Sequence, residues 1–192
     1  MSIRIFLIIF ALTIFLTASV PVYADHDTTP AASGSAAKKT VEYTMPYPGL
    51  LPDSPFYNIK MVRDRFVEFL ISDLLKQAEF DLLQADKRMQ AGIYLINKDG
   101  KKANLSLATI AKGQQYFKKS LNDAAQAKKQ GHPIKTFSSK LHLSAQKHAE
   151  LLHSVEKKIP ANEAGYYKRI EAEAIKLMQE ASALDRKEHA KI

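Results

Sequence analysis

Apolar residues beyond position 54 recur at intervals of three and four, which is the spacing of one face of an α-helix. The clearest stripe predicts a helix at about 73–97. It consists of Leu75, Ala78, Leu82, Ala85, Met89, Ile93 and Ile96. Comparable stripes predict helices at about 103–130, 134–158 and 162–189. Because no segment shows the sustained alternation of a β-strand, we expect an all-α protein.

Another helix is expected at about 55–71. Its apolar face is formed by Phe56, Ile59, Phe66, Phe69 and Leu70, with Val62 or Arg63 filling the gap. Ser72 is a suitable N-cap for the helix that follows, and Asp73 suits the positive end of its dipole. Neither glycine nor proline enforces a break there, so one bent helix is the alternative to two.

Short turns connect the predicted helices. "KDGKK" at 98–102 is one turn, Gly131 and Pro133 end the helix before them, and Asn162 is expected to cap the last helix. Long helices joined by short links pack antiparallel. We therefore expect an antiparallel up-down bundle of four to five long helices, preceded by a proline-rich extended strap.

The strap, residues 43–54, belongs to the stretch "YTMPYPGLLPDSPFYNIK", which has four prolines in residues 43–60. Proline biases the residue before it toward extended conformations. Ser54 is thereby prepared as an N-cap, and Pro55 suits the first helical position, where its missing N–H costs nothing. The alternative is a recognition surface for sugars or a peptide. It would use Tyr43, Tyr47, Phe56 and Tyr57.

Residues 1–24 have the pattern of a secretory signal: Arg4, an apolar run at 5–16, and "VYA" before a cleavage site between Ala24 and Asp25. An uncleaved N-terminal anchor is the alternative. Either segment predicts an extracytoplasmic protein, secreted or associated with the cell envelope. Residues 25–42 are small and polar, as in a flexible linker. Residues 43–192 are then the single helical domain.

The chain is basic, with 28 lysines and arginines against 20 acidic residues. Eight lysines fall in residues 98–129. We take Lys112, Lys118, Lys119, Lys128 and Lys129 as candidate contacts to an anionic surface. The partner would be an anionic envelope polymer, a membrane surface or another envelope protein. Nucleic acid is not expected, because this stretch has no arginine for base contacts. The alternative is that the lysines only solvate a helix.

Motifs for catalysis are missing from the sequence. There is no cysteine, no Gly-x-Ser-x-Gly elbow and no phosphate-binding loop, so we predict no enzyme, no cofactor and no small-molecule substrate. Glu150 and His153 have the spacing of a di-iron motif, but such sites need a second copy. His148 lies in an apolar stripe and is expected to be a buried neutral histidine with one hydrogen-bond partner. A haem ligand, metal ligand or pH switch is the alternative.

"PYPGLLPDSPFYNIK", followed by "RDRFVEFLISDLLKQAEFDLLQADKRMQAG", resembles an uncharacterised family of exported bacterial all-helical proteins. The Leu-Pro-x-Ser-Pro-x-Tyr-x-x-Lys signature of that domain of unknown function matches Leu51, Pro52, Ser54, Pro55, Tyr57 and Lys60. A second stretch of the family looks like Ala78, Glu79, Leu82, Ala85 and Arg88. The similarity covers roughly residues 43–130. It implies export and helical architecture. That family has no assigned activity, so no catalytic residues can be carried over from it.

These observations predict an exported, non-enzymatic helical module with a binding or scaffolding role at the cell envelope. Two other functions stay open. One is a metal- or haem-binding helical bundle centred on His148 and His153. The other is an extracytoplasmic chaperone or sensor, for which a large exposed apolar patch would be the sign.

Overall fold

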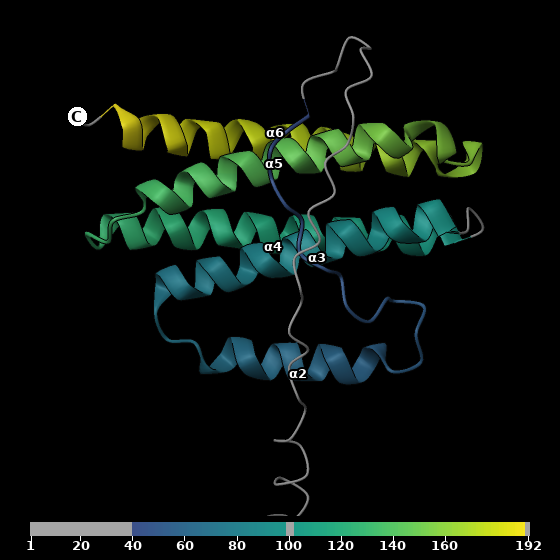
Figure 1. Cartoon of the computed structure of the whole chain (residues 1–192), viewed down its shortest axis with the longest axis horizontal. Helices are drawn as coiled ribbons and strands as arrows, with labels where there is room; N and C mark the ends of the chain where they lie inside the picture. Colours follow the sequence, from purple (N-terminus) through teal and green to yellow (C-terminus); the bar gives the residue numbers. More distant parts are fainter. Residues whose placement is uncertain (1–39, 99–101, 191–192) are drawn as a thin grey trace, which may run out of the picture. The chain divides into compact units, whose positions relative to one another are not determined.

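The computed structural model describes residues 40–98 and 102–190, all within one compact unit. The described residues form five α-helices and two short 3₁₀ turns and contain no strand, so the all-α prediction is confirmed. The helices are α2 (Tyr57–Leu70), α3 (Leu74–Lys98), α4 (Ala103–Lys129), α5 (Lys135–Val155) and α6 (Ala164–His189) (Figure 1). The predicted signal, the linker up to residue 39 and the centre of the turn at 98–102 lie outside the described residues.

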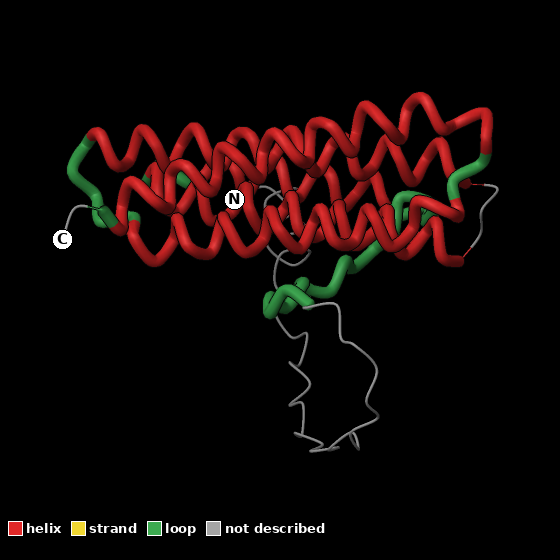
Figure 2. Tube along the Cα trace, turned by 90° about the horizontal axis from the view of Figure 1, so that it is seen from above, coloured by secondary structure: helices red, strands yellow, loops and turns green. Residues whose placement is uncertain are grey.

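The four long helices lie side by side (Figures 1 and 2). The most extensive packing joins α3 to α4 and α5 to α6, and further contacts join α4 to α6 and α3 to α5. The shorter helix α2 lies at the edge of this group, below α3 and α4 in the view of Figure 1. Its backbone makes far fewer close contacts than those of the long helices, so side chains hold it in place.

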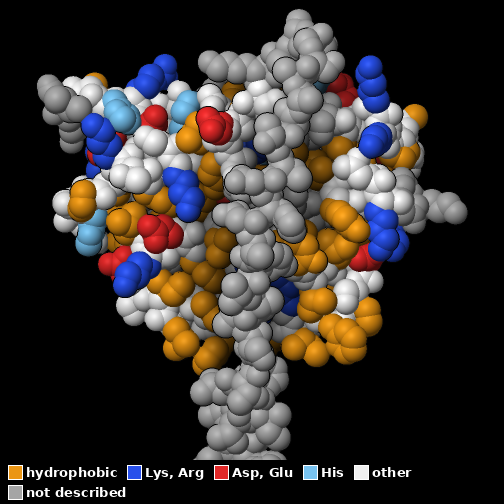
Figure 3. All heavy atoms as spheres, viewed as in Figure 1, with side chains coloured by type: hydrophobic (Ala, Val, Ile, Leu, Met, Phe, Trp, Pro, Cys, Tyr) orange, Lys and Arg blue, Asp and Glu red, His pale blue; other side chains and the backbone are white. Residues whose placement is uncertain are grey.

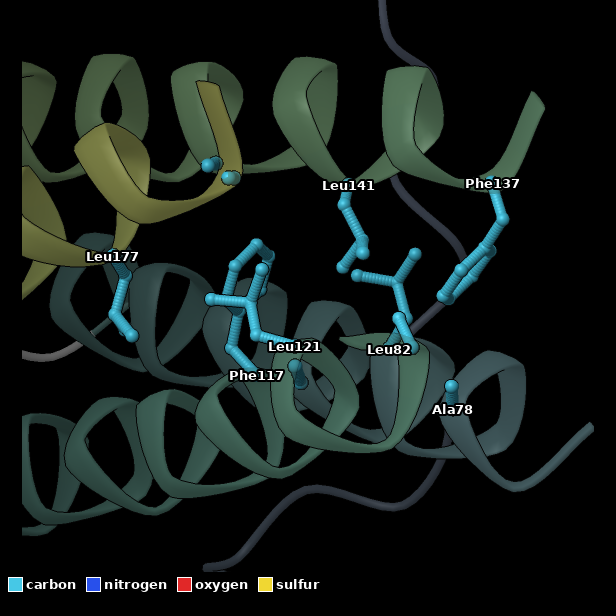
Figure 4. Packing of buried hydrophobic residues seen from close by; sticks show 11 residues of the cluster. Ala78, Leu82, Phe117, Leu121, Phe137, Leu141 and Leu177 are labelled. Carbon is cyan, nitrogen blue, oxygen red and sulfur yellow. The ribbon is translucent and has the colours of Figure 1, made fainter. Parts of the chain in front are cut away.

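The predicted stripes form the core. Ala78, Leu82, Ala85, Met89, Ile93 and Ile96 of α3 are all buried, whereas Leu75 is only half-buried. Figure 4 shows how Leu82, Phe117, Leu141 and Leu177, one from each long helix, point toward one another. A second cluster lies around Met89, Ile110, Leu152 and Tyr167. Burial of side chains of this size is the main stabilising term of such a fold.

Two glycines allow α3 and α4 to approach closely. A Cβ atom added to Gly92 would lie 2.8 Å from the Ser106 carbonyl oxygen and would overlap the Ile110 side chain. A Cβ atom added to Gly113 would lie 3.0 Å from the Ala85 carbonyl oxygen. No other residue type fits the Gly92 position without a shift of the opposite helix.

The break between the first two helices is real. Ile71 has an extended backbone conformation and α3 begins at Leu74. The predicted cap was wrong, because Asp73 rather than Ser72 takes that role. The Asp73 carboxylate accepts a 2.8 Å hydrogen bond from the Lys76 backbone N–H, and the Asp73 carbonyl accepts one from Gln77. This is the pattern of an N-cap residue.

Two other helix starts also differ from the prediction. Residues 51–57 form consecutive turns, so α2 begins at Tyr57 rather than Pro55. The Ser54 hydroxyl accepts only a long 3.4 Å contact from the Phe56 N–H. A 3₁₀ turn at Ala161–Glu163 precedes α6, and Asn162 does not cap it. In both places a tight turn provides backbone hydrogen bonds at the helix start, where a capping side chain was expected to accept them. Gly131 ends α4 as predicted, with φ of 89°.

Candidate functional site

The apolar side of α2 faces away from the other helices. We call Phe56, Ile59, Val62, Phe66, Phe69 and Leu70 the α2 apolar face. These side chains are exposed, from 62% for Phe56 to 82% for Phe69. Figure 3 shows hydrophobic side chains gathered along the lower edge of the view, where α2 lies. The stripe foreseen from the sequence exists, but it belongs to the surface and not to the core.

The inner side of α2 is polar. Asp64 is the one buried residue of α2, and it receives two hydrogen bonds from the neighbouring Arg63. Lys60 donates hydrogen bonds of 2.8 and 3.2 Å to the carbonyl oxygens of Pro48 and Leu50. An amphipathic helix of a soluble protein ordinarily turns its apolar stripe to the core. Here that orientation is reversed.

An ion cluster joins α2 to α3 and α4. The Lys119 ammonium lies 2.5 Å from Glu68 Oε1 and 3.1 Å from Asp81 Oδ2. The Asp81 side chain is fully buried, and burial raises its pKa to about 6 although Lys119 acts in the opposite direction. Burial also raises the pKa of Asp123 close by. Desolvation is therefore the dominant electrostatic effect on these carboxyl groups.

A groove of about 590 Å³ lies between α2, the start of α3 and α4. Arg65, Glu68, Phe69, Lys112, Tyr116 and Lys119 are among the residues that line it. We call it the cationic groove, because its lining has three cationic side chains and one carboxylate. A second hollow of about 480 Å³ adjoins it on α2 and is lined by Met61, Val62, Arg65, Phe66 and Phe69. Arg65 and Phe69 therefore contribute to both.

The five candidate lysines do not form one face. Lys112 and Lys119 are seven positions apart, about two helical turns, and both line the cationic groove. Lys118 and Lys129 are exposed elsewhere on α4. Lys128 forms an ion pair with Glu188 of α6. Of the five candidate lysines, only Lys112 and Lys119 therefore share the groove.

Arg65 is a residue that reasoning from the sequence missed. Arg65 adjoins the apolar stripe of α2 in the sequence pattern. Because that stripe was expected to face the bundle, Arg65 was not considered as a binding residue. With the stripe on the surface, Arg65 lies at the border between the apolar face and the groove. Long basic side chains at such a border are typical of helices that lie at membrane surfaces.

A second polar cluster surrounds Asp86 in the interior. Its carboxylate accepts 2.6 Å hydrogen bonds from the hydroxyls of Tyr43 and Ser144, and His148 Nε2 lies 2.8 Å from it. The His148 ring packs edge-on against Phe117. Burial of His148 with a hydrogen-bond partner is confirmed. Although Ser, His and Asp meet here, Ser144 bonds to Asp86 and not to His148, so this is not the nucleophile–base arrangement of a hydrolase.

The other histidine motif does not come together. His153 is exposed and lies 3.5 Å from Glu156. Glu150 instead accepts a hydrogen bond from the Val41 backbone N–H. Within residues 40–98 and 102–190, no group of three or more histidine and acidic side chains is arranged to hold a metal ion.

The residues of the proline-rich signature have structural contacts. Lys60 binds the two carbonyl oxygens of the preceding segment and lies 5.6 Å from the centre of the Tyr57 ring. Leu51, Pro52 and Ser54 lie in the turns before α2, and Pro55 is exposed there. Next to them is a hollow of about 490 Å³ whose lining includes the exposed rings of Tyr47 and Tyr94. This hollow is where the strap would bind a sugar or a peptide under the recognition hypothesis.

Comparisons with family models, curated proteins and solved structures gave no match to this chain. The resemblance at residues 43–130 thus stays a prediction. Among the described residues no helix is both long enough and apolar enough to span a bilayer.

Proposed function

We propose that this protein is an exported, non-enzymatic module that lies on an anionic membrane surface of the cell envelope through α2. The single observation that carries the proposal is the outward orientation of the α2 apolar face. The proposal includes the finer architecture expected from the sequence: α3 to α6 as an antiparallel up-down bundle, with residues 43–54 as a strap that holds α2.

The apolar contribution to binding comes from the six side chains of the α2 apolar face, five of them on α2 and Phe56 directly before it. Transfer of a Val, Leu, Ile or Phe side chain from water to an apolar environment stabilises by about 1.5–3 kcal/mol when burial is complete. The helix has 14 residues and is about 21 Å long. A helix of this kind lies in the plane of the membrane interface with its apolar side in the boundary between headgroups and acyl chains.

Charge supports an anionic surface over a neutral one. Arg63 and Arg65 of α2 are exposed, and Lys112 lies across the cationic groove from Arg65. Basic residues near a membrane surface gain about 1 kcal/mol each from anionic lipids, and added salt screens this gain. Binding should therefore fall as salt rises but keep an apolar remainder.

Vesicle co-sedimentation of the full 192-residue chain tests the proposal, with vesicles of phosphatidylglycerol and phosphatidylcholine mixed or of phosphatidylcholine alone. We expect binding to the anionic vesicles, and a loss of about tenfold or more in affinity for a variant with Val62→Glu and Phe66→Glu. Ile175→Glu on α6 is the matched control, since Ile175 is also exposed. The N-terminal apolar run is present in all three proteins, so their differences report on α2. Equal binding by all three would overturn the proposal.

The extracytoplasmic chaperone is the second candidate, because the α2 apolar face is the exposed apolar patch that this function requires. It predicts that the protein suppresses aggregation of an unfolding client without any lipid. The Val62→Glu and Phe66→Glu variant should then lose this suppression. Vesicle binding without suppression would exclude the chaperone, and suppression without vesicle binding would replace the membrane proposal.

A further inference from the structure

The cationic groove and the α2 apolar face form one continuous amphipathic surface. We infer that the groove binds the phosphate group of a single anionic phospholipid, whose acyl chains lie along the α2 apolar face. This inference rests on the proposed function and adds to it a defined headgroup site.

Arg65 is the central residue of this site. Its side chain has no hydrogen-bond or ion-pair partner among the residues that the structure describes, although it lines both the groove and the apolar hollow of α2. A guanidinium group binds phosphate through two parallel hydrogen bonds. An unpaired arginine at the border of a polar and an apolar surface therefore has the chemistry of a phosphodiester ligand site.

The wall formed by α4 contributes further donors. Lys112 donates a 2.9 Å hydrogen bond to Gln115 and lies 5.7 Å from the centre of the Tyr116 ring. Neither contact neutralises its charge. Lys119 is different, because Glu68 and Asp81 already neutralise it and hold it in place. Arg65 and Lys112 are thus the two cations available to a ligand, and Lys119 is a fixed part of the wall.

The size and position of the groove agree with this ligand. A volume of about 590 Å³ lies within the roughly 300–1,000 Å³ of small-molecule sites. Phe69 lines both the groove and the adjoining hollow. A lipid with its phosphate at Arg65 therefore has its glycerol backbone beside Phe69 and its chains directed along the exposed side of α2.

Titration of the full chain with dihexanoyl phosphatidylglycerol, at concentrations where this short lipid is monomeric, tests the site. Binding is followed by NMR or calorimetry. We expect saturable binding, weakened about fivefold or more in Arg65→Gln and in Lys112→Gln, which corresponds to about 1 kcal/mol. Lys118→Gln, on the same helix but outside the groove, should bind as the unmodified protein does. Melting curves confirm that each variant is folded.

Two further probes identify the source of the phosphate. Dihexanoyl phosphatidylcholine should bind more weakly, because its choline cation meets Arg65 and Lys112. Inorganic phosphate alone should bind far more weakly, because it makes no contact with Phe69. Equal affinity for inorganic phosphate would overturn the lipid assignment. No monomeric lipid binding, with vesicle binding intact and still dependent on Val62 and Phe66, would end this inference and leave the proposed function standing. Loss of both would end both.

Discussion

The Tyr43 hydroxyl donates a 2.6 Å hydrogen bond to the buried carboxylate of Asp86 on α3. This contact attaches the segment before α2 to the interior, and the carboxylate holds Ser144 and His148 of α5 at the same time. Burial, followed by the charge of Asp86, raises the pKa of Tyr43 well above its usual value. The hydroxyl therefore stays protonated and a donor throughout the neutral range.

Tyr43→Phe removes this donor and leaves Asp86 with one partner fewer. A hydrogen bond to a charged group contributes about 1.5–3 kcal/mol, so we expect the free energy of unfolding to fall by about 2 kcal/mol in urea titrations. Tyr47→Phe is the control, because the Tyr47 side chain is 82% exposed. A Tyr43→Phe protein as stable as the Tyr47→Phe protein would contradict this role of the hydroxyl.

Asp81 makes the stability of the fold depend on pH. Its pKa rises from 3.8 to about 6 on folding, so between these values the folded state binds more protons than the unfolded state. Stability from this group is then complete below pH 4 and is lost as pH rises through 6. Asp81→Asn should therefore be more stable than the unmodified protein at pH 7, on the order of 2–3 kcal/mol, and about equally stable at pH 4.

Asp53 is the control for that experiment, because its pKa is shifted in the direction opposite to that of Asp81. Hydrogen bonding to Lys102 holds the pKa of Asp53 below its usual value, so its stabilising effect is present at neutral pH and lost as pH falls through that lowered pKa. Asp53→Asn should lower stability at pH 7. Urea midpoints of both variants at pH 4 and pH 7 give the comparison, and the same sign for both would contradict the assignment of Asp81.

Gly92→Ala places a methyl group against the Ser106 carbonyl and the Ile110 side chain. Overpacking of this kind costs about 1–3 kcal/mol, so the melting temperature should fall. Gly165→Ala is the matched substitution, because its Cβ has nothing within 4 Å in the first turn of α6. There the helix propensity of alanine should raise stability by up to about 1 kcal/mol.

The capping roles of Ser54 and Asp73 can be compared directly. Asp73→Ala should cost about 1 kcal/mol, because it removes the acceptor of the Lys76 N–H. Ser54→Ala should cost less, since the Ser54 hydroxyl makes only the long contact to Phe56. Thermal unfolding of the two variants decides between this order and the reverse order, which the sequence pattern suggested.

Much of the fold could be predicted from the sequence because core positions repeat with the period of the helix. The stripe from Ala78 to Ile96 is buried as periodicity indicated. Gly131 follows the end of α4 in a left-handed backbone conformation, which glycine adopts readily. The helix starts could not be placed as well. Ser54, Ser72 and Asn162 all have capping side chains, and the choice among neighbouring candidates depends on local turns.

The candidate site was harder to predict than the core. Periodicity shows that α2 has an apolar side but not which way that side faces. Its orientation depends on contacts outside the helix: Lys119 of α4 with Glu68, and Lys60 with the carbonyls of Pro48 and Leu50. For the same reason the position of Arg65 at the border of the groove could not be predicted from periodicity.

The polar inner side of α2 also affects how this helix separates from the rest. Unfolding an element normally raises the heat capacity in proportion to the apolar area that becomes wet. On α2 most of the apolar area is already exposed to solvent in the folded state. Opening of α2 alone should therefore change the heat capacity little, and its free energy should depend weakly on denaturant concentration. Amide hydrogens of Tyr57–Leu70 should therefore exchange through a local opening, well before those of α3 and α4.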